Sequence, residues 1–276
     1  MGGMVMAFQN YKPWLGITGS EFVGLDNFKQ IFEFKESYQA IINTFIIAVS
    51  KMVLGLIFPI IVALLLNEVH NMGVKKGIQT LVYLPHFLSW VTVAGMLRDI
   101  LGMDGIVNMF LQKVFGMDPI FFLGNAGMFR QIVVISDLWK GFGFGMIVYL
   151  AAISNIDQSL YEAAQIDGAT ASQILFKIKI PMIAATITIC TFLTLTSAFK
   201  QFDVNMALTN GTGSVASFFG NYLTNGTQML ALNIYNTAIS KNNYALGQAK
   251  AILFFIILAA VSIIQVRISN KKEVEM

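Results

Sequence analysis

The most distinctive part of the sequence is YEAAQIDGA, residues Tyr161–Ala169, followed shortly by IKIP, residues Ile178–Pro181. Its polar and small residues lie between two long apolar runs. Of the 276 residues in the chain, 56% are hydrophobic and 12% are charged, and the mean hydropathy is +0.67, whereas soluble domains carry about 25% charged residues. Such a composition belongs in lipid, so the sequence predicts an all-α integral membrane protein with this stretch outside the lipid as a docking surface.

The first half of the stretch has the residues of a short helix that ends in a glycine turn. Ser159 and Glu162 lie three residues apart, match a capping box and predict a helix that begins near Ser159. Ala163 and Ala164 favour a helix and have so little bulk that a partner surface can approach closely. Gly168 suits the left-handed conformation in which many helices end.

The second half predicts another short helix. Ser172 is placed to cap a helix that carries Ile174, Leu175 and Ile178, and Pro181 is placed where a new helix begins, because a missing N–H costs little there. The residues thus predict two short helices joined by a glycine elbow that projects from the membrane. An ordinary capped loop between two membrane helices fits the same spacing equally well.

Five segments are apolar over the roughly 20 residues that a helix needs to cross a bilayer. They are approximately Ala40–Asn67, Gly77–Leu101, Met128–Ile153, Pro181–Gln201 and Leu246–Ile268. The segment Ile106–Phe115 is too short and is interpreted as an interfacial or re-entrant helix. The long polar stretch Phe202–Tyr244 contains turn signals at Asn210-Gly211 and Asn225-Gly226.

The density of basic residues predicts the orientation. With the YEAAQIDGA stretch in the cytoplasm, the inner segments carry Lys75, Lys76, Lys177, Lys179, Arg267, Lys271 and Lys272. The outer segments carry basic residues more thinly, which agrees with the positive-inside rule. Residues 1–39 are then an external segment, residues 40–268 the transmembrane domain and residues 269–276 a cytoplasmic tail. Because Met1–Phe8 is apolar but too short to cross, we expect the chain to begin partway through its first helix.

Several motifs resemble one family. Glu162-Ala163-Ala164, Asp167-Gly168-Ala169 and Ile178-x-Ile180-Pro181 resemble the EAA loop of binding-protein-dependent ABC importer permeases, here residues 155–181, although Leu175 stands where that loop often carries Phe. Gly24–Phe28 resembles a segment of the sugar-importer permeases. Tyr83–Trp90 and Phe8–Trp14 resemble the branch that handles oligosaccharides and polysaccharide fragments. The resemblance spans nearly the whole chain and implies the transmembrane domain of an ABC type I importer, with about six spans where five are visible.

The resemblance also implies how the chain works. In that family the EAA loop seats in a groove on an ATPase subunit, so the coupling residues carried over by position are Glu162, Ala163, Ala164, Asp167 and Gly168. The implied partners are a second, homologous permease, two ABC ATPase subunits that bind ATP and magnesium, an extracellular solute-binding protein and membrane lipid. The implied location is the bacterial inner (cytoplasmic) membrane, which the chain crosses several times.

A second set of residues is expected along the substrate pathway: Lys51, Asp137, Lys140, Phe142, Phe144 and Lys200. Charges at membrane depth cost about 2.5–3.5 kcal/mol each and are functional by default. Asp137 and Lys140 share a helix face and can pair, either to fix helix packing or to line the pathway. Lys200 can also snorkel to the interface. The run Gly141–Gly145 includes the Gly-x-x-x-Gly spacing of closely packed membrane helices, and its aromatic residues serve packing or stack on sugar rings.

Other classes of function have little support. The chain has no Gly-Lys dipeptide and therefore no P-loop, no catalytic constellation, and only Cys190 with two distant histidines, so no enzyme, cofactor or metal site is predicted. The net charge of +3 does not suggest nucleic acid. The alternatives to an ATP-driven sugar importer subunit are a secondary transporter or channel subunit, which needs no ATPase, and a scaffold without a pathway.

Overall fold

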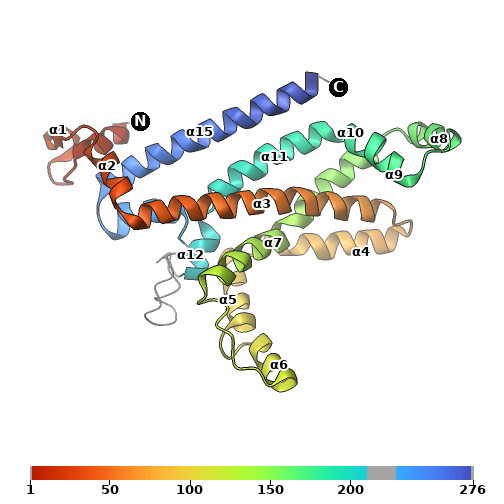
Figure 1. The fold of residues 1–276 in the computed structure, drawn as a ribbon, viewed down its shortest axis with the longest axis horizontal. Helices are drawn as coiled ribbons and strands as arrows, with labels where there is room; N and C mark the ends of the chain where they lie inside the picture. The colour runs from red at the N-terminus through yellow and green to blue at the C-terminus, as the bar shows by residue number, and fades with distance from the viewer. Residues whose placement is uncertain (1, 210–227, 275–276) are drawn as a thin grey trace. The chain divides into compact units, whose positions relative to one another are not determined.

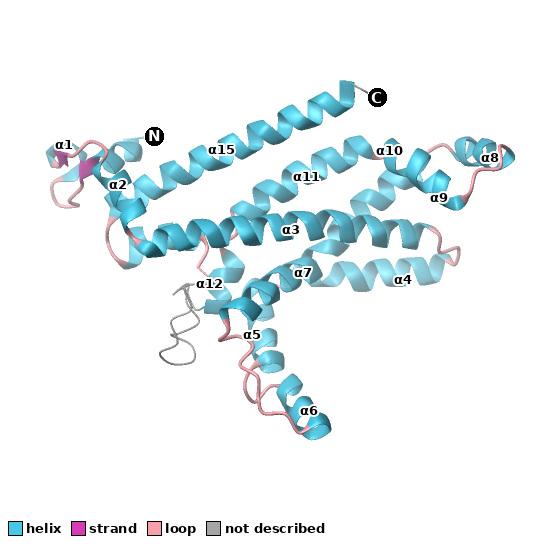
Figure 2. Cartoon of the chain, viewed as in Figure 1, coloured by secondary structure: helices cyan, strands magenta, loops and turns pink. Residues whose placement is uncertain are grey.

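The computed structural model describes residues 2–209 and 228–274, and almost all of the regular structure in them is helical (Figure 2). The described strands are β1 (Gln9–Asn10) and β2 (Glu21–Phe22), which pair antiparallel with Gln9 opposite Phe22. The turns expected at Asn210-Gly211 and Asn225-Gly226 lie outside the described residues.

Figure 1 follows the helices in chain order. Their bounds are η1 (Gly2–Phe8), α1 (Gly16–Gly19), α2 (Asp26–Glu33), α3 (Lys35–Asn67), α4 (Met72–Tyr83), η2 (Leu84–Phe87), α5 (Trp90–Leu101), α6 (Ile106–Phe115), α7 (Ala126–Ser154), α8 (Gln158–Ile166), α9 (Ala171–Ile174), η3 (Leu175–Lys179), α10 (Ile180–Met182), α11 (Ala184–Phe199), α12 (Asp203–Thr209), α14 (Leu230–Tyr235), η4 (Asn236–Ser240) and α15 (Tyr244–Val274). The polar stretch Phe202–Tyr244 therefore contains short helices in its described parts.

Three described helices are long and apolar enough to cross a membrane: α3, α7 over Gly127–Ser154 and α15 over Tyr244–Arg267. Two further segments, Met72–Phe115 and Ala171–Thr209, qualify only as pairs of helices joined at a break, so the described chain has up to five spans. Each of the five expected segments overlaps one of these candidate spans, three of which are single helices and two of which are bent pairs. The first break follows the short turn η2, which contains Pro85, and a proline removes one backbone donor from a helix.

The chain divides into two compact units, which are described separately. Unit 1 comprises residues 1–48, 89–135 and 198–263. One of its cores joins α3, α5, α7 and α12 through buried residues such as Ile47, Ala94, Phe129 and Val204. A second core packs α2 against the start of α15 through Ile31, with Leu246 and Ala249.

The N-terminal part of unit 1 is organised by Asn27, which belongs to the Gly24–Phe28 motif. Gly24 has φ +60°, a conformation that costs glycine little. The turn sets α2 so that the buried Asn27 side chain donates to the carbonyls of Ala7 (2.9 Å) and Gln9 (3.0 Å). The motif therefore ties η1 and β1 to the helix that leads into α3.

Unit 2 comprises residues 49–88, 136–197 and 264–276. Its core joins the end of α3 to α7 and to the break before α11 through buried residues such as Leu66, Met146, Tyr149 and Ile183. Close packing of α7 depends on glycine, because a Cβ at Gly143 would overlap the Val82 carbonyl and one at Gly145 would lie 3.3 Å from Pro59. The unit carries α8 and α9 beyond its core.

Candidate functional site

The candidate coupling loop, residues 155–181, consists of α8, a glycine turn and α9, with η3 and α10 leading on to α11 (Figure 1). Asp157 caps α8: its Oδ1 accepts from the Ser159 N–H at 3.0 Å, and this hydrogen bond lowers the pKa of the Asp157 carboxyl. The helix begins at Gln158, so the prediction of a capping box at Ser159 and Glu162 is wrong. An aspartate was available two residues earlier, at the point where the chain leaves α7. Glu162 is instead exposed in the body of α8.

The elbow forms at Gly168, as predicted. Its φ is +76°, in the left-handed region. The Ala169 N–H donates to the Ala164 carbonyl at 2.9 Å, and the Gly168 N–H donates to the Gln165 carbonyl at 3.0 Å. These two hydrogen bonds define a Schellman motif, which satisfies carbonyls at the end of α8 and fixes the direction of the chain beyond it.

The second short helix, α9, begins at Ala171, three residues after Gly168. Thr170, not Ser172, is its cap: Thr170 Oγ1 accepts from the Gln173 N–H at 3.3 Å, and Gln173 Oε1 accepts from the Thr170 N–H at 2.7 Å. Because of this reciprocal capping box, only Ala169 and Thr170 lie between Gly168 and α9. The prediction of Ser172 as the cap was therefore wrong by two residues.

Pro181 lies in the first positions of the short helix α10, as predicted, although α10 follows the preceding helix without a gap. The helical chain continues from α9 through the π-helix η3 into α10, and the direction changes by 63° at Ile183, before α11. A π-turn widens the backbone and is one way to accommodate a proline whose ring would clash with the preceding turn. The bend places the buried side chain of Ile183 in the core of unit 2.

Two large apolar side chains on the surface of the loop are exposed. Ile166 at the end of α8 is 86% exposed and Phe176 on η3 is 64% exposed, although both are large and apolar. A hollow of about 220 Å³ in the elbow is lined by the candidate coupling residues Asp167 and Gly168 together with Ala169, Gln173, Ile174, Lys177 and Ile178. Exposed apolar side chains with polar neighbours mark a site of protein interaction.

Three of the four expected pathway charges, Lys51, Asp137 and Lys140, lie in unit 2, and each of these three has a partner. Lys51 Nζ on α3 forms an ion pair with Asp137 Oδ2 on α7 at 2.9 Å, and Lys140 Nζ donates to the His86 carbonyl at 2.8 Å. Asp137 thus bridges two helices, a contact that spacing along one helix did not suggest. Lys140 meets a backbone carbonyl that lies at the break after α4.

The two aromatic candidates take different positions in unit 2. Phe142 lies edge-on to Phe58 with ring centroids 5.1 Å apart. Phe144 is 49% exposed and stacks on His86, with ring centroids 5.0 Å apart. The remaining candidate, Lys200, belongs to unit 1 and is exposed just beyond the end of α11.

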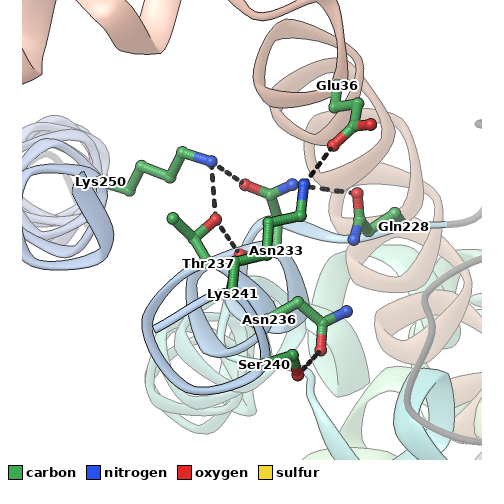
Figure 3. Close-up of polar contacts among 8 residues, drawn as sticks. All are labelled: Glu36, Gln228, Asn233, Asn236, Thr237, Ser240, Lys241 and Lys250. Carbon is green, nitrogen blue, oxygen red and sulfur yellow. Dashed lines mark hydrogen bonds and ion pairs between the residues drawn. The ribbon is translucent and has the colours of Figure 1, made fainter. Parts of the chain in front are cut away.

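One buried charge in unit 1 was missed by the sequence reasoning. Lys250 on α15 is 4% exposed, and its Nζ donates to Asn233 Oδ1 (2.7 Å) and Thr237 Oγ1 (2.9 Å) (Figure 3). The signal was present, because Lys250 is a lysine within the apolar segment Leu246–Ile268, just as Lys51 is within Ala40–Asn67. Its acceptors lie on α14 and η4, in a stretch that had been interpreted only as polar and turn-rich.

The comparisons with known proteins identify the family. Residues 55–274 match the family described as "Binding-protein-dependent transport system inner membrane component". The chain is 36% identical over 249 residues to the polygalacturonan/rhamnogalacturonan transport system permease protein YteP of Bacillus subtilis (strain 168), covering 90% of this chain and 78% of the relative. It is 33% identical to the probable starch degradation products transport system permease protein AmyD of Thermoanaerobacterium thermosulfurigenes, covering 98% and 87%.

A solved structure agrees with this result. A chain in the crystal structure of a bacterial ABC transporter involved in the import of the acidic polysaccharide alginate matches with a TM-score of 0.79 and 31% identity, covering 98% of this chain and 87% of that one. The fold, the long apolar helices and these matches define a multi-pass membrane permease of the ABC type I importer class. The chain belongs to the family of binding-protein-dependent transport system inner membrane components, in its sugar-transport branch.

Proposed function

We propose that this chain is one permease subunit of an ATP-driven importer for oligosaccharides released from polysaccharides, in the bacterial cytoplasmic membrane. It forms half of the membrane pathway, beside a second permease. Two ATPase subunits bind ATP and magnesium, and an external solute-binding protein delivers the sugar. The names of the relatives support the substrate class, because they refer to polygalacturonan and rhamnogalacturonan, to starch degradation products and to the acidic polysaccharide alginate.

The observation that carries the proposal is the rigid, exposed elbow at Gly168. Its Schellman motif and the capping box that follows leave the two short helices little freedom relative to one another. Ile166 supplies an exposed apolar contact, Glu162 a charge, and Ala163 and Ala164 a surface of low bulk. Such a projection suits a groove on a partner that moves when it binds nucleotide.

The pathway role rests on the chemistry of carbohydrate recognition. Lys140 and Phe144 lie near the break after α4, where one offers an ammonium group and the other a partly exposed ring. Lys51 and Asp137 form an ion pair, which avoids an isolated charge at membrane depth. Phe142 supports this region of unit 2 through Phe58, and Lys200 is a separate exposed cation in unit 1. These six residues are therefore the positions at which substitutions should alter uptake.

The test separates ATP-driven import from its main alternative. The permease is reconstituted with its second permease and ATPase in proteoliposomes, and uptake of labelled trigalacturonate and maltotriose is measured with the solute-binding protein present. The proposal expects uptake of at least one of these sugars that requires ATP and persists when ionophores collapse all ion gradients. Uptake that needs no ATP and follows an imposed ion gradient would identify a secondary transporter.

A second experiment tests the orientation. In a Cys190→Ser background, cysteines are placed at two exposed serines, Ser172 on α9 and Ser240 on η4. The proposal expects Ser240→Cys to react with an impermeant thiol reagent in intact cells, and Ser172→Cys to react only after the membrane is opened. The reverse pattern would place the coupling loop outside the cell.

A further inference from the structure

The end of α3 contacts the exit of the coupling loop, although 111 residues of chain separate them. Lys179 Nζ, at the end of η3, forms an ion pair with Glu68 Oε1 at 2.5 Å. Glu68 is the first residue after α3, and the Lys179 side chain is only 14% exposed although its partner is largely exposed. Both residues belong to unit 2.

A third residue joins this contact from α8. The Lys179 ammonium lies 5.5 Å from the centroid of the Tyr161 ring. Tyr161 directly precedes the proposed coupling residue Glu162 in the sequence. The Tyr161 hydroxyl is buried and has no hydrogen-bond partner among the described residues. Its pKa is raised first by burial and then by the Glu68 charge, while the Lys179 ammonium lowers the pKa of the Glu68 carboxyl. Lys179 therefore connects α8, η3 and the end of α3.

Apolar packing supports the same connection. Leu66 at the end of α3 and Ile183 at the bend before α11 are both buried in the core of unit 2, and Tyr161 packs against that core. A cavity of about 750 Å³ beside the ion pair is lined by residues of α3, α8, α9 and η3, including Glu68, Tyr161 and Lys179. Because packed cores are not continuously deformable, contacts that join these elements favour their movement together.

We propose that the Glu68–Lys179 ion pair, with the Tyr161 ring, is a fastening that makes α3 move together with the coupling loop. Nucleotide-driven motion of α8 and α9 then reaches the membrane by two routes, through α10 into α11 along the chain and through Lys179 into α3. Glu68, Lys179 and Tyr161 are positioning residues and do not contact the sugar. The inference rests on the proposed coupling function of the loop.

The test uses the complete transporter and compares Glu68→Gln, Lys179→Gln and the exchanged pair Glu68→Lys with Lys179→Glu. Lys76→Gln on α4, an exposed lysine in the same unit, is the matched control. Retention of the ATPase on purified membranes should stay at the parental level in all variants, because the docking surface is intact. The number of trigalacturonate molecules imported per ATP hydrolysed should fall about two- to fivefold in the single variants, in line with the strength of a partly exposed ion pair. It should recover in the exchanged pair and stay unchanged in Lys76→Gln.

A distance measurement tests the fastening without any sugar. Nitroxide labels are placed at Ile61 on α3 and Ser172 on α9, both exposed, in the Cys190→Ser background. In the parent, the distance distribution between the labels should not change when ATP is trapped on the ATPase. The same result is expected for the exchanged pair. In the single variants it should shift or broaden on ATP trapping. The proposed link between α3 and the loop would be overturned if the single variants kept the parental distance distribution on ATP trapping. It would also be overturned if the exchanged pair shifted or broadened as much as the single variants. If the parent or the control variant Lys76→Gln failed to retain the ATPase on purified membranes, that result would instead count against the proposed coupling function of the loop.

Discussion

The Ala169 N–H reaches back across Gly168 to the Ala164 carbonyl at 2.9 Å, and this contact sets the angle between α8 and α9 in the candidate coupling loop. It exists because Gly168 has φ +76°, where a side chain with a Cβ costs about 1 kcal/mol or more. The space around Gly168 is open, so backbone conformation alone restricts the position.

Gly168→Val should therefore redirect α9 without disturbing the membrane helices. We expect the variant to insert and to assemble with the second permease, but to lose ATP-driven uptake. Gly168→Asn is the control, because asparagine tolerates the left-handed region and should retain most of the uptake. Equal uptake by the parent and by Gly168→Val would show that the elbow angle is irrelevant.

Close packing at Gly143 gives a matched pair of substitutions in one helix. A Cβ at Gly143 would overlap the Val82 carbonyl, whereas one at Gly141 would meet nothing within 4 Å. Gly143→Ala should lower the free energy of unfolding in detergent by about 1–3 kcal/mol through overpacking. Gly141→Ala should leave it unchanged or raise it by about 0.5–1 kcal/mol through lower backbone entropy. Similar effects of the two substitutions would contradict the packing described for α7.

The Lys250 cluster predicts energetic coupling between α15 and α14. Lys250→Met leaves Asn233 Oδ1 buried without its donor, and Asn233→Leu leaves the Lys250 ammonium short of an acceptor (Figure 3). Each single change should destabilise the protein by about 1–3 kcal/mol, and the double variant by less than the sum. The control is Asn236→Leu, which alters a neighbour bonded to Ser240 and should add to Lys250→Met without coupling. Additive effects in the first pair would refute the contact.

The Glu68–Lys179 ion pair predicts a pH dependence of defined sign. Lys179 holds the pKa of Glu68 below its ordinary value of 4.5. A carboxyl with a lowered pKa in the folded state stabilises the protein above its unfolded pKa and loses that effect as the pH falls through the folded pKa. The unfolding temperature of the parent should therefore exceed that of Glu68→Gln at pH 7, and the gap should close below pH 4.5. A gap that stays constant on acidification would mean that the ion pair contributes nothing.

The sequence predicted the helical membrane fold and the position of the elbow because both depend on local properties. Long apolar runs specify spans, and Gly168 was the one residue in its stretch suited to positive φ. The caps were displaced by two residues because Asp157 and Thr170 compete for the same role as Ser159 and Ser172. Spacing alone does not rank such competitors.

Contacts between distant parts of the chain could not be predicted. The partners of Asp137 and Lys179 lie 86 and 111 residues away, on α3 or at its end, and no periodicity relates them. Lys250 was overlooked because its acceptors lie in a polar stretch where short helices were not expected. Tertiary packing decided these pairs, and only the folded chain reveals them.

A photo-crosslink from the candidate coupling loop tests most directly whether this loop docks on the ATPase subunit. A photoreactive phenylalanine derivative replaces Ile166, which is 86% exposed at the end of α8, and the protein is irradiated in its own cells. We expect a crosslink from Ile166 to the ATPase subunit. This crosslink should require Gly168 and should be lost in Glu162→Lys. The same derivative at Met72 on α4, the control position, should give no such product. Crosslinks from Ile166 only to lipid or to the permease itself, in cells that import the sugar normally, would contradict the account.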